Sequence, residues 1–160
     1  MLVDGDGGER RQQLLSILRG MPPLSFERLC QELLSRAGLD EVMVTGRPGD
    51  EGIDGRAMVR FAGIISLPVV FQCKRYSRSV TAPMIREFRG AMTGRADRGL
   101  FITTGNFTGR AVQEAKRDGA PFLDLIDGEL LVDKLIELSI GVTVSQDGAV
   151  DVNPGWFANI

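Results

Sequence analysis

The chain has 160 residues, of which 43% are hydrophobic and 25% charged, and this composition suits one globular domain with an apolar core. Its net charge of −2, with two cysteines (Cys30 and Cys73) and no histidine, excludes His-ligated zinc, Ser-His-Asp catalysis and Cys-His catalysis. A bound metal must therefore lie among carboxylates and carbonyls, which favour a hard ion such as Mg2+ or Mn2+.

No apolar run in the sequence reaches the length needed to cross a bilayer. Residues 63–71 are mostly apolar, but the stretch is short and is interrupted by Ser66 and Pro68. Residues 1–8 are acidic and rich in glycine, unlike a signal peptide. We therefore expect a cytoplasmic protein with no membrane partner.

The N-terminal part of the chain predicts two helices. Residues 1–8 are expected to form a flexible leader, and residues 9–19 a short amphipathic helix that ends at the Gly20-Met-Pro-Pro segment. A second helix is predicted over residues 25–37, with Ser25 as its N-cap. Apolar side chains at helical spacing form its expected buried stripe: Phe26, Leu29, Cys30, Leu33 and Leu34.

Three strands should follow these helices. Residues 41–45 predict a short strand, and residues 46–52 a loop. Two longer strands, 53–61 and 69–76, are expected to pair as an antiparallel hairpin through an irregular turn at 62–68.

The remainder of the core alternates helices and strands. Helices are predicted at 81–92, 107–118 and 128–138, and strands at 99–104 and 121–126. Strands separated by a helix should be parallel, with right-handed crossovers. The fold class is therefore α/β, with a mixed central sheet that combines an antiparallel hairpin and a parallel βαβ crossover between helical layers.

The sequence suggests three parts along the chain. Residues 1–20 are expected to form a leader and short helix of the kind that can serve as a linker; residues 21–140 form the main domain; and residues 141–160 are a C-terminal tail. The tail carries alternating valines on either side of a Gln-Asp-Gly turn, which indicates a hairpin, and Trp156 and Phe157 are expected to dock it on the body.

Two polar residues stand out in the strand at 69–76. Gln72 and Lys74 lie on one face, where a central strand is expected to be apolar, whereas Cys73 points to the other face. A hairpin centred near Ile64 would place Asp54 opposite Lys74 and Arg56 opposite Gln72. On these features alone a cross-strand salt bridge is favoured over a catalytic pair.

Glu27 is a third candidate, in the first turn of the second helix beside Phe26. An acidic residue here commonly complements the helix dipole, so its position alone indicates no chemistry.

Several separate segments, in order, resemble one family. They are Phe26-Glu27, residues 46–54 (GRPGDEGID), residues 71–76 (FQCKRY), residues 101–108 (FITTGNFT) and residues 125–128 (LIDG). Together they resemble the catalytic domain of Mrr-type restriction endonucleases, within the PD-(D/E)xK nuclease class. The resemblance covers roughly residues 24–140 and outweighs the salt-bridge interpretation.

This resemblance implies a set of catalytic residues. Asp54 would bind the metal together with the backbone carbonyl of Cys73, and Glu27 would complete the site directly or through water. Gln72 and Lys74 would form the Q-x-K variant of the (D/E)xK pair. Because a neutral amide is a weaker ligand than a carboxylate, one well-held Mg2+ or Mn2+ is expected. Lys74 would orient the attacking water and stabilise negative charge on the phosphate.

DNA contacts are expected just beyond these residues. The segment 74–117 holds ten basic and three acidic residues, a net +7, whereas the rest of the chain holds nine basic and eighteen acidic ones, a net −9. Such a segment can attract a phosphate backbone, although solvated helix faces explain it equally well. For Asn106 and Thr108, ordinary helix capping is an equal alternative. The candidate DNA-binding residues are Arg75, Arg78, Thr103, Thr104, Asn106 and Thr108.

The expected function is that of a metal-dependent endonuclease that cuts double-stranded DNA, in a system that restricts foreign or methylated DNA. Cutting both strands with one site per chain favours a homodimer, and the family usually carries a separate DNA-recognition domain, here absent or supplied by a partner chain. Two alternatives remain open. One is a non-cleaving DNA-binding or assembly module of the same fold, and the other is a junction resolvase or repair nuclease.

Overall fold

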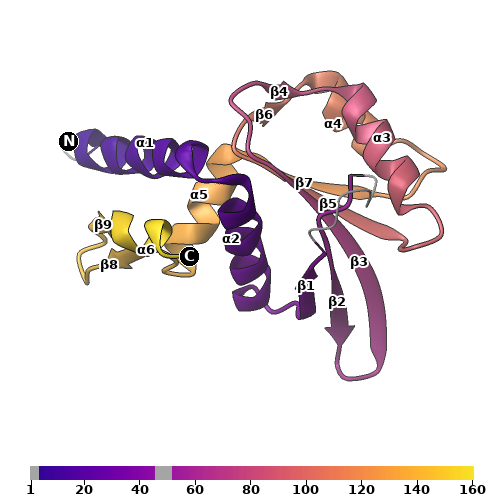
Figure 1. The fold of residues 1–160 in the computed structure, drawn as a ribbon, viewed down its shortest axis with the longest axis horizontal. Helices are drawn as coiled ribbons and strands as arrows, with labels where there is room; N and C mark the ends of the chain where they lie inside the picture. Colours follow the sequence, from indigo (N-terminus) through magenta and orange to yellow (C-terminus); the bar gives the residue numbers. More distant parts are fainter. Residues whose placement is uncertain (1–3, 46–51) are drawn as a thin grey trace.

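The computed structural model describes residues 4–45 and 52–160, and its centre is a five-stranded sheet in the order β1-β2-β3-β5-β7 (Figure 1). Its strands are β1 (Asp40–Val44), β2 (Gly55–Phe61), β3 (Ile65–Lys74), β5 (Arg98–Thr103) and β7 (Leu123–Ile126). The pairs β1–β2 and β2–β3 are antiparallel, whereas the pairs β3–β5 and β5–β7 are parallel. The predicted α/β class and mixed sheet are confirmed.

Helices cover both faces of this sheet (Figure 1). One side carries α1 (Asp4–Gly20), α2 (Pro23–Arg36) and α5 (Gly128–Glu137), and the other carries α3 (Ala82–Met92) and α4 (Gly109–Ala115). Because successive strand side chains point to opposite faces, β3 serves both layers.

Two apolar clusters reflect this alternation. Phe71 of β3 packs with Leu14 and Leu29 of the first side, whereas Val70 packs with Phe88 on the opposite side. The predicted buried stripe of the second helix is confirmed, since all five of its side chains are buried. The core therefore holds the middle of β3 rigidly, and the polar residues at its carboxyl end lie beyond it.

The two N-terminal helices start earlier than predicted. The first begins at Asp4, so the expected leader over residues 1–8 is wrong for residues 4–8. The second begins at Pro23, with Pro22 at the N-cap position and no side-chain cap, so Ser25 is not the cap. Proline fits the first turn of a helix, because its missing N–H has no partner there.

The β2–β3 hairpin is longer and its turn tighter than predicted. The turn spans residues 62–64, with Ala62 and Gly63 at φ values of 52° and 67°. Pro68 lies within β3, opposite Met58. The backbone N–H and C=O groups of even-numbered residues in β3 face β5. Pairing between β3 and β5 begins only at Val69, so the N–H that Pro68 lacks would have had no partner in β5.

This longer strand changes the register. Gly55 lies opposite Phe71, and Arg56 lies opposite Val70, not opposite Gln72. The predicted pairing of Asp54 with Lys74 is wrong by two residues, because the tight turn moves the centre of the hairpin. Both strands still end at the same edge of the sheet.

The connection after β5 also differs from the prediction. Ser79–Val80 (β4) and Asn106–Phe107 (β6) form a short parallel pair, and α4 begins only at Gly109. The predicted helix over 107–118 is therefore too long at both ends, because Phe107 belongs to a strand and α4 ends at Ala115.

The C-terminal segment joins the first apolar cluster. It forms the predicted hairpin, β8 (Val142–Val144) with β9 (Val150–Val152), followed by the short helix α6 (Pro154–Ala158). Phe157 is buried, and its ring lies so close to Gly141 that a Cβ there would overlap it. Over residues 4–45 and 52–160, no helix is long and apolar enough to span a membrane.

Candidate active site

Asp54 lies at the carboxyl edge of the sheet and links β2 to the end of β3. Its backbone N–H donates to the Phe71 carbonyl at 2.9 Å. Its carboxylate oxygen Oδ2 accepts from the backbone N–H of Cys73 at 2.7 Å. These two bonds fix the carboxylate directly beside the strand that carries Gln72 and Lys74.

Glu27 reaches the same point from the first turns of α2. Its carboxyl group is a hydrogen-bonding neighbour of Asp54. Burial, repulsion by Asp54 and this hydrogen bond raise the pKa of Glu27. Burial also raises the pKa of Asp54, although the bonds from Cys73 and Glu27 oppose the shift. Two half-buried carboxylates that face each other favour either a shared proton or a cation.

The backbone of Cys73 completes an oxygen-rich corner. The Lys74 carbonyl accepts from Thr104 on the β5 side, so the Cys73 carbonyl, one residue earlier, points to the side of Asp54. Over residues 4–45 and 52–160 no group of three or more His, Cys, Asp and Glu side chains could hold a metal. A metal here would therefore use two carboxylates and one carbonyl, which suits a hard divalent ion.

Gln72 faces the start of the loop before Asp54. Its amide oxygen and nitrogen lie 3.8 and 3.9 Å from the position of a Cβ at Gly52. Continuing the ladder places Gln72, rather than Lys74, opposite Asp54. The remainder of that predicted loop, 46–51, lies outside the described residues.

Lys74 ends β3 and is half-buried. Its ammonium nitrogen lies 5.0 Å from the centroid of the Tyr76 ring, a cation–π contact. Within the described part of the chain no ion pair involves Lys74, so the predicted alternative of a salt bridge to Asp54 is not observed. A half-buried lysine without an acidic partner remains free to meet an anion.

The two threonines at the end of β5 are buried. Thr103 and Thr104 are both 0% exposed. The Thr104 hydroxyl accepts from the N–H of Tyr76 and donates to its carbonyl, both at 2.8 Å, and the Thr103 hydroxyl accepts from Gly105. The expectation that these side chains contact phosphate is corrected: they brace the segment that follows Lys74.

Asn106 and Thr108 lie nearer the surface. Asn106 is exposed, and its side-chain oxygen accepts from the Ser79 hydroxyl. Thr108 is the N-cap of α4 and accepts from the N–H of Ala111 at 3.1 Å, so the capping alternative describes it.

The two predicted arginines are exposed beside the site. Arg78 lies on the loop after β3, and its carbonyl packs against Gly105 so closely that no side chain would fit there. Arg75 donates from Nη1 to the Arg19 carbonyl at 2.8 Å, which brings the end of α1 to the site. Sequence patterns gave no signal for Arg19, because it lies 56 residues from Arg75.

The two cysteines lie behind the site and are both free. Burial, followed by the neighbouring Cys30, raises the pKa of the Cys73 thiol well above its ordinary value. Cys30 is buried in the first apolar cluster and the half-buried Cys73 packs against it, which agrees with the predicted packing role.

Two solved restriction endonucleases share this fold. The DNA modification-dependent restriction endonuclease AspBHI superposes with a TM-score of 0.70 and 19% identity, over 99% of this chain and 41% of that one. The MspJI restriction endonuclease, solved in complex with a 27-mer oligonucleotide, gives a TM-score of 0.59 and 23% identity, over 84% of this chain and 32% of that one.

The sequence comparisons narrow this class to a family. The Mrr_cat model, described as a restriction endonuclease, matches residues 18–135, so the chain belongs to the Mrr restriction endonuclease family. It is 36% identical over 139 residues to the type IV methyl-directed restriction enzyme EcoKMrr of Escherichia coli (strain K12). The alignment covers 82% of this chain and 43% of that protein, so this chain spans less than half of its relative's length. Endonuclease domains of this family generally use divalent metal ions.

Proposed function

We propose that this chain hydrolyses phosphodiester bonds of double-stranded DNA with Mg2+ or Mn2+ at the corner formed by Glu27, Asp54 and β3. The observation that carries the proposal is the pair of facing carboxylates, Glu27 and Asp54, of which Asp54 accepts from the Cys73 N–H. The next residue along β3 is Lys74, a lysine without an acidic partner in the described part of the chain. A purely structural site would pair these opposite charges with each other.

Each residue has a distinct part in this mechanism. Asp54, Glu27 and the Cys73 carbonyl would hold the metal, which would polarise the phosphate and acidify a bound water. Lys74, held by the Tyr76 ring, orients the attacking water and stabilises charge that develops on the phosphate. Gln72 lies next to Gly52, at the start of the segment that leads to Asp54, and its uncharged amide adds no negative charge to the site.

The substrate we propose is modified DNA. The matching part of EcoKMrr belongs to an enzyme named as methyl-directed, and AspBHI is named as modification-dependent. We place the catalytic unit at residues 21–140, with α1 and residues 141–160 bracing it through the shared apolar cluster. Reading of the modification would fall to a separate recognition domain or partner chain, and cutting of both strands to a homodimer.

The state of the cysteines agrees with a cytoplasmic site of action. Both cysteines are free, as is usual in a reducing compartment.

Plasmid cleavage tests the proposed function. Methylated and unmethylated supercoiled plasmids are incubated with Mg2+, Mn2+ or EDTA and with the wild-type chain, Asp54→Ala or Lys74→Ala. Asp124→Ala and Lys134→Ala are matched controls, because both residues form exposed ion pairs away from the site. We expect metal-dependent nicking or linearisation that both site variants lose and both controls keep.

Other outcomes would contradict the proposal in different ways. Cleavage that survives both site substitutions would show that the chemistry lies elsewhere. Binding without cleavage under every metal condition would favour a DNA-binding or assembly module. A strong preference for four-way junctions over plasmid would favour a resolvase.

A further inference from the structure

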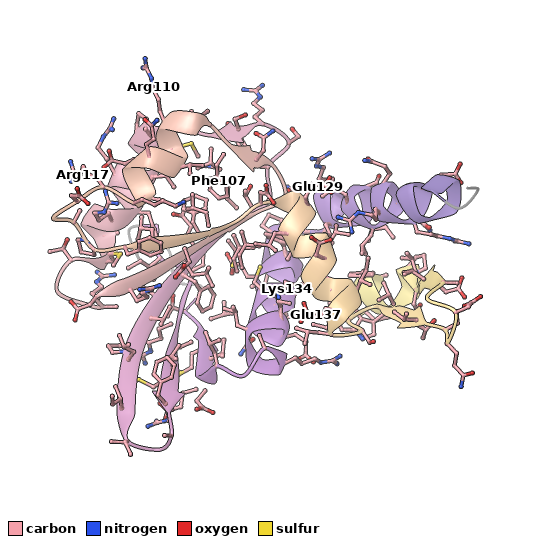
Figure 2. All side chains as sticks on the ribbon, turned by 180° about the vertical axis from the view of Figure 1, so that it is seen from behind. Phe107, Arg110, Arg117, Glu129, Lys134 and Glu137 are labelled. Atoms are coloured by element: carbon pink, nitrogen blue, oxygen red, sulfur yellow. The ribbon has the colours of Figure 1, made fainter. Side chains whose placement is uncertain are left out.

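Ion pairs neutralise many of the cations that lie away from the active-site edge. Lys134 and Glu137, for example, lie along α5 (Figure 2) and pair at 2.9 Å. The cations in such pairs are Arg10, Arg11, Arg36, Arg60, Arg86, Arg89, Arg98, Arg117 and Lys134.

Four cations at the carboxyl edge of β3 differ from these. Arg19, Lys74, Arg75 and Arg78 have no acidic partner among residues 4–45 and 52–160. Gathering like charges without compensation costs free energy, and binding of a polyanion removes that cost.

Backbone carbonyls hold two of these cations in place. Arg75 donates from Nη1 to the Arg19 carbonyl at 2.8 Å, and Arg19 donates from Nη2 to the Thr104 carbonyl at 3.0 Å. A guanidinium has five N–H donors, so each arginine keeps several for another acceptor. These bonds orient both side chains and leave their charge intact.

The same contacts tie the pair to the catalytic strand. Thr104 donates its N–H to the Lys74 carbonyl at 3.3 Å, and its hydroxyl bonds both backbone groups of Tyr76. The end of α1 therefore lies against the chain that leaves β3, as Figure 1 shows. Arg19 is anchored on a residue that directly contacts the backbone of Lys74.

We propose that Arg19 and Arg75 form a clamp for a DNA backbone phosphate next to the scissile one. The inference rests on the proposed function for its substrate, and it assigns a binding role to α1, which otherwise serves as a brace. Arginine suits this role because its planar fork can bind two phosphate oxygens at once. The clamp positions the backbone and reads no sequence.

The competing explanation is that these arginines only fasten α1 to the sheet. Arg11 supplies the matched control, because it also lies on α1 and fastens it to α5. It bonds Glu129 at 2.9 Å and Asp133 at 2.6 Å, so its charge is already neutralised. Removing Arg11 takes away one charge and one fastening without touching the clamp.

Salt-dependent DNA binding tests the clamp. All variants carry Asp54→Ala, so that duplex DNA stays uncut, and Kd is measured over a range of NaCl concentrations alongside Tm. We expect Arg19→Gln and Arg75→Gln each to weaken binding about tenfold and to reduce the slope of log Kd against log salt by about one unit. Arg11→Gln should lower Tm and leave both Kd and the slope unchanged, and Arg19→Lys should restore most of the slope.

The result that overturns the clamp is a lower Tm in Arg19→Gln and Arg75→Gln with Kd and slope equal to those of the parent. Failure of the two proposals can be told apart. If the wild-type chain cuts plasmid but the slope does not change, the clamp alone fails. If it binds DNA with the expected slope changes but never cuts, the clamp stands and the nuclease fails. If it binds no DNA, both fail.

Discussion

Two regions of the molecule bring charged groups close together, and the charges are compensated in one region but not in the other. On α4, Glu114 meets Arg86, Arg89 and Arg117 at 3.5, 2.7 and 3.7 Å. Arg89 is only 6% exposed and also donates to the Pro121 carbonyl at 3.2 Å. Arg117, labelled in Figure 2, is the most exposed of the three arginines, at 57%.

The active-site corner leaves its charges uncompensated. Burial alone would raise the pKa of Glu114, but the bond from Arg89 and the charges of Arg117, Arg89 and Arg86 hold it below its ordinary value. At the corner, by contrast, the pKa of both Glu27 and Asp54 is raised. A cluster that serves the fold pairs its charges, whereas one that serves a ligand leaves them for the ligand to pair.

The largest expected effect comes from breaking the corner. Asp54→Asn keeps an oxygen that can accept from the Cys73 N–H but removes a carboxylate from the metal position. We expect cleavage to fall about a thousandfold, a loss of roughly 4 kcal/mol in transition-state stabilisation. Because a buried like-charge contact is also removed, Tm in EDTA should stay the same or rise. Plasmid cleavage and a thermal melt measure both effects, and a variant that cuts normally would contradict the assignment.

Breaking the paired cluster should have the opposite consequence. Arg89→Ala leaves the Glu114 carboxylate beside two more exposed partners, and we expect the free energy of unfolding to fall several-fold more than in Arg117→Ala. Cleavage per folded molecule should be unchanged, because the cluster lies away from β3. Urea unfolding gives the free energy. Arg117→Ala is the control, since this exposed pair should contribute less than about 1 kcal/mol.

Much of the fold could be predicted from the sequence because periodic apolar residues mark the elements. The buried stripe from Phe26 to Leu34 and the apolar strand Leu100-Phe101-Ile102 were both identified in this way. The hairpin register was not, because it depends on a three-residue turn in which Ala62 adopts a φ of 52°. Nothing local in the sequence predicts that conformation for alanine.

The candidate site likewise contains residues that the sequence predicts and residues that it does not. Asp54, Gln72, Lys74 and Glu27 belong to short motifs that a resemblance can transfer, and the structure brings Glu27 and Asp54 together at the end of β3. The sequence could not predict the burial of Thr103 and Thr104, because that burial depends on tertiary contacts such as the one between Thr104 and Tyr76. The position of Arg19 at the site could not be predicted from the sequence, because its hydrogen-bond partners lie 56 and 85 residues away.

Acid sensitivity should separate the cluster from the corner. A carboxyl whose pKa is lowered by folding stabilises the protein above its unfolded pKa, and this contribution is lost as pH falls through the lower folded value. The wild-type chain should therefore lose stability below about pH 4.3, the ordinary pKa of glutamate, more steeply than Glu114→Gln. The urea midpoints of both proteins are measured from about pH 3 to about pH 7, which spans the ordinary pKa of glutamate. Equal slopes would show that the arginines do not stabilise the ionised form.

A metal should stabilise the corner that protein groups leave uncompensated. If Mg2+ binds with a Kd of about 1 mM, then about 10 mM Mg2+ adds roughly 1.4 kcal/mol to the free energy of unfolding. The same addition should not stabilise Asp54→Asn, which lacks one of the two carboxylates. Thermal melts at constant ionic strength test this without reference to cleavage. An equal shift in both proteins would place the ion elsewhere.

The smallest effect concerns the group that holds Lys74. The centroid of the Tyr76 ring lies 5.0 Å from the Lys74 ammonium nitrogen. The Thr104 hydroxyl hydrogen-bonds to both the N–H and the carbonyl of Tyr76. Exposed cation–π contacts contribute about 0.5–1 kcal/mol, so Tyr76→Leu should lower kcat about twofold to fivefold with little change in KM.

Tyr76→Phe is the matched variant, because it keeps the ring and removes only the hydroxyl. It should cut DNA at nearly the wild-type rate if the ring face positions Lys74. If phenylalanine and leucine impair cleavage equally, the hydroxyl and not the ring is what matters. If neither substitution has an effect, Lys74 is positioned by the strand alone, and the contrast between the corner and the Glu114 cluster then rests on the carboxylates.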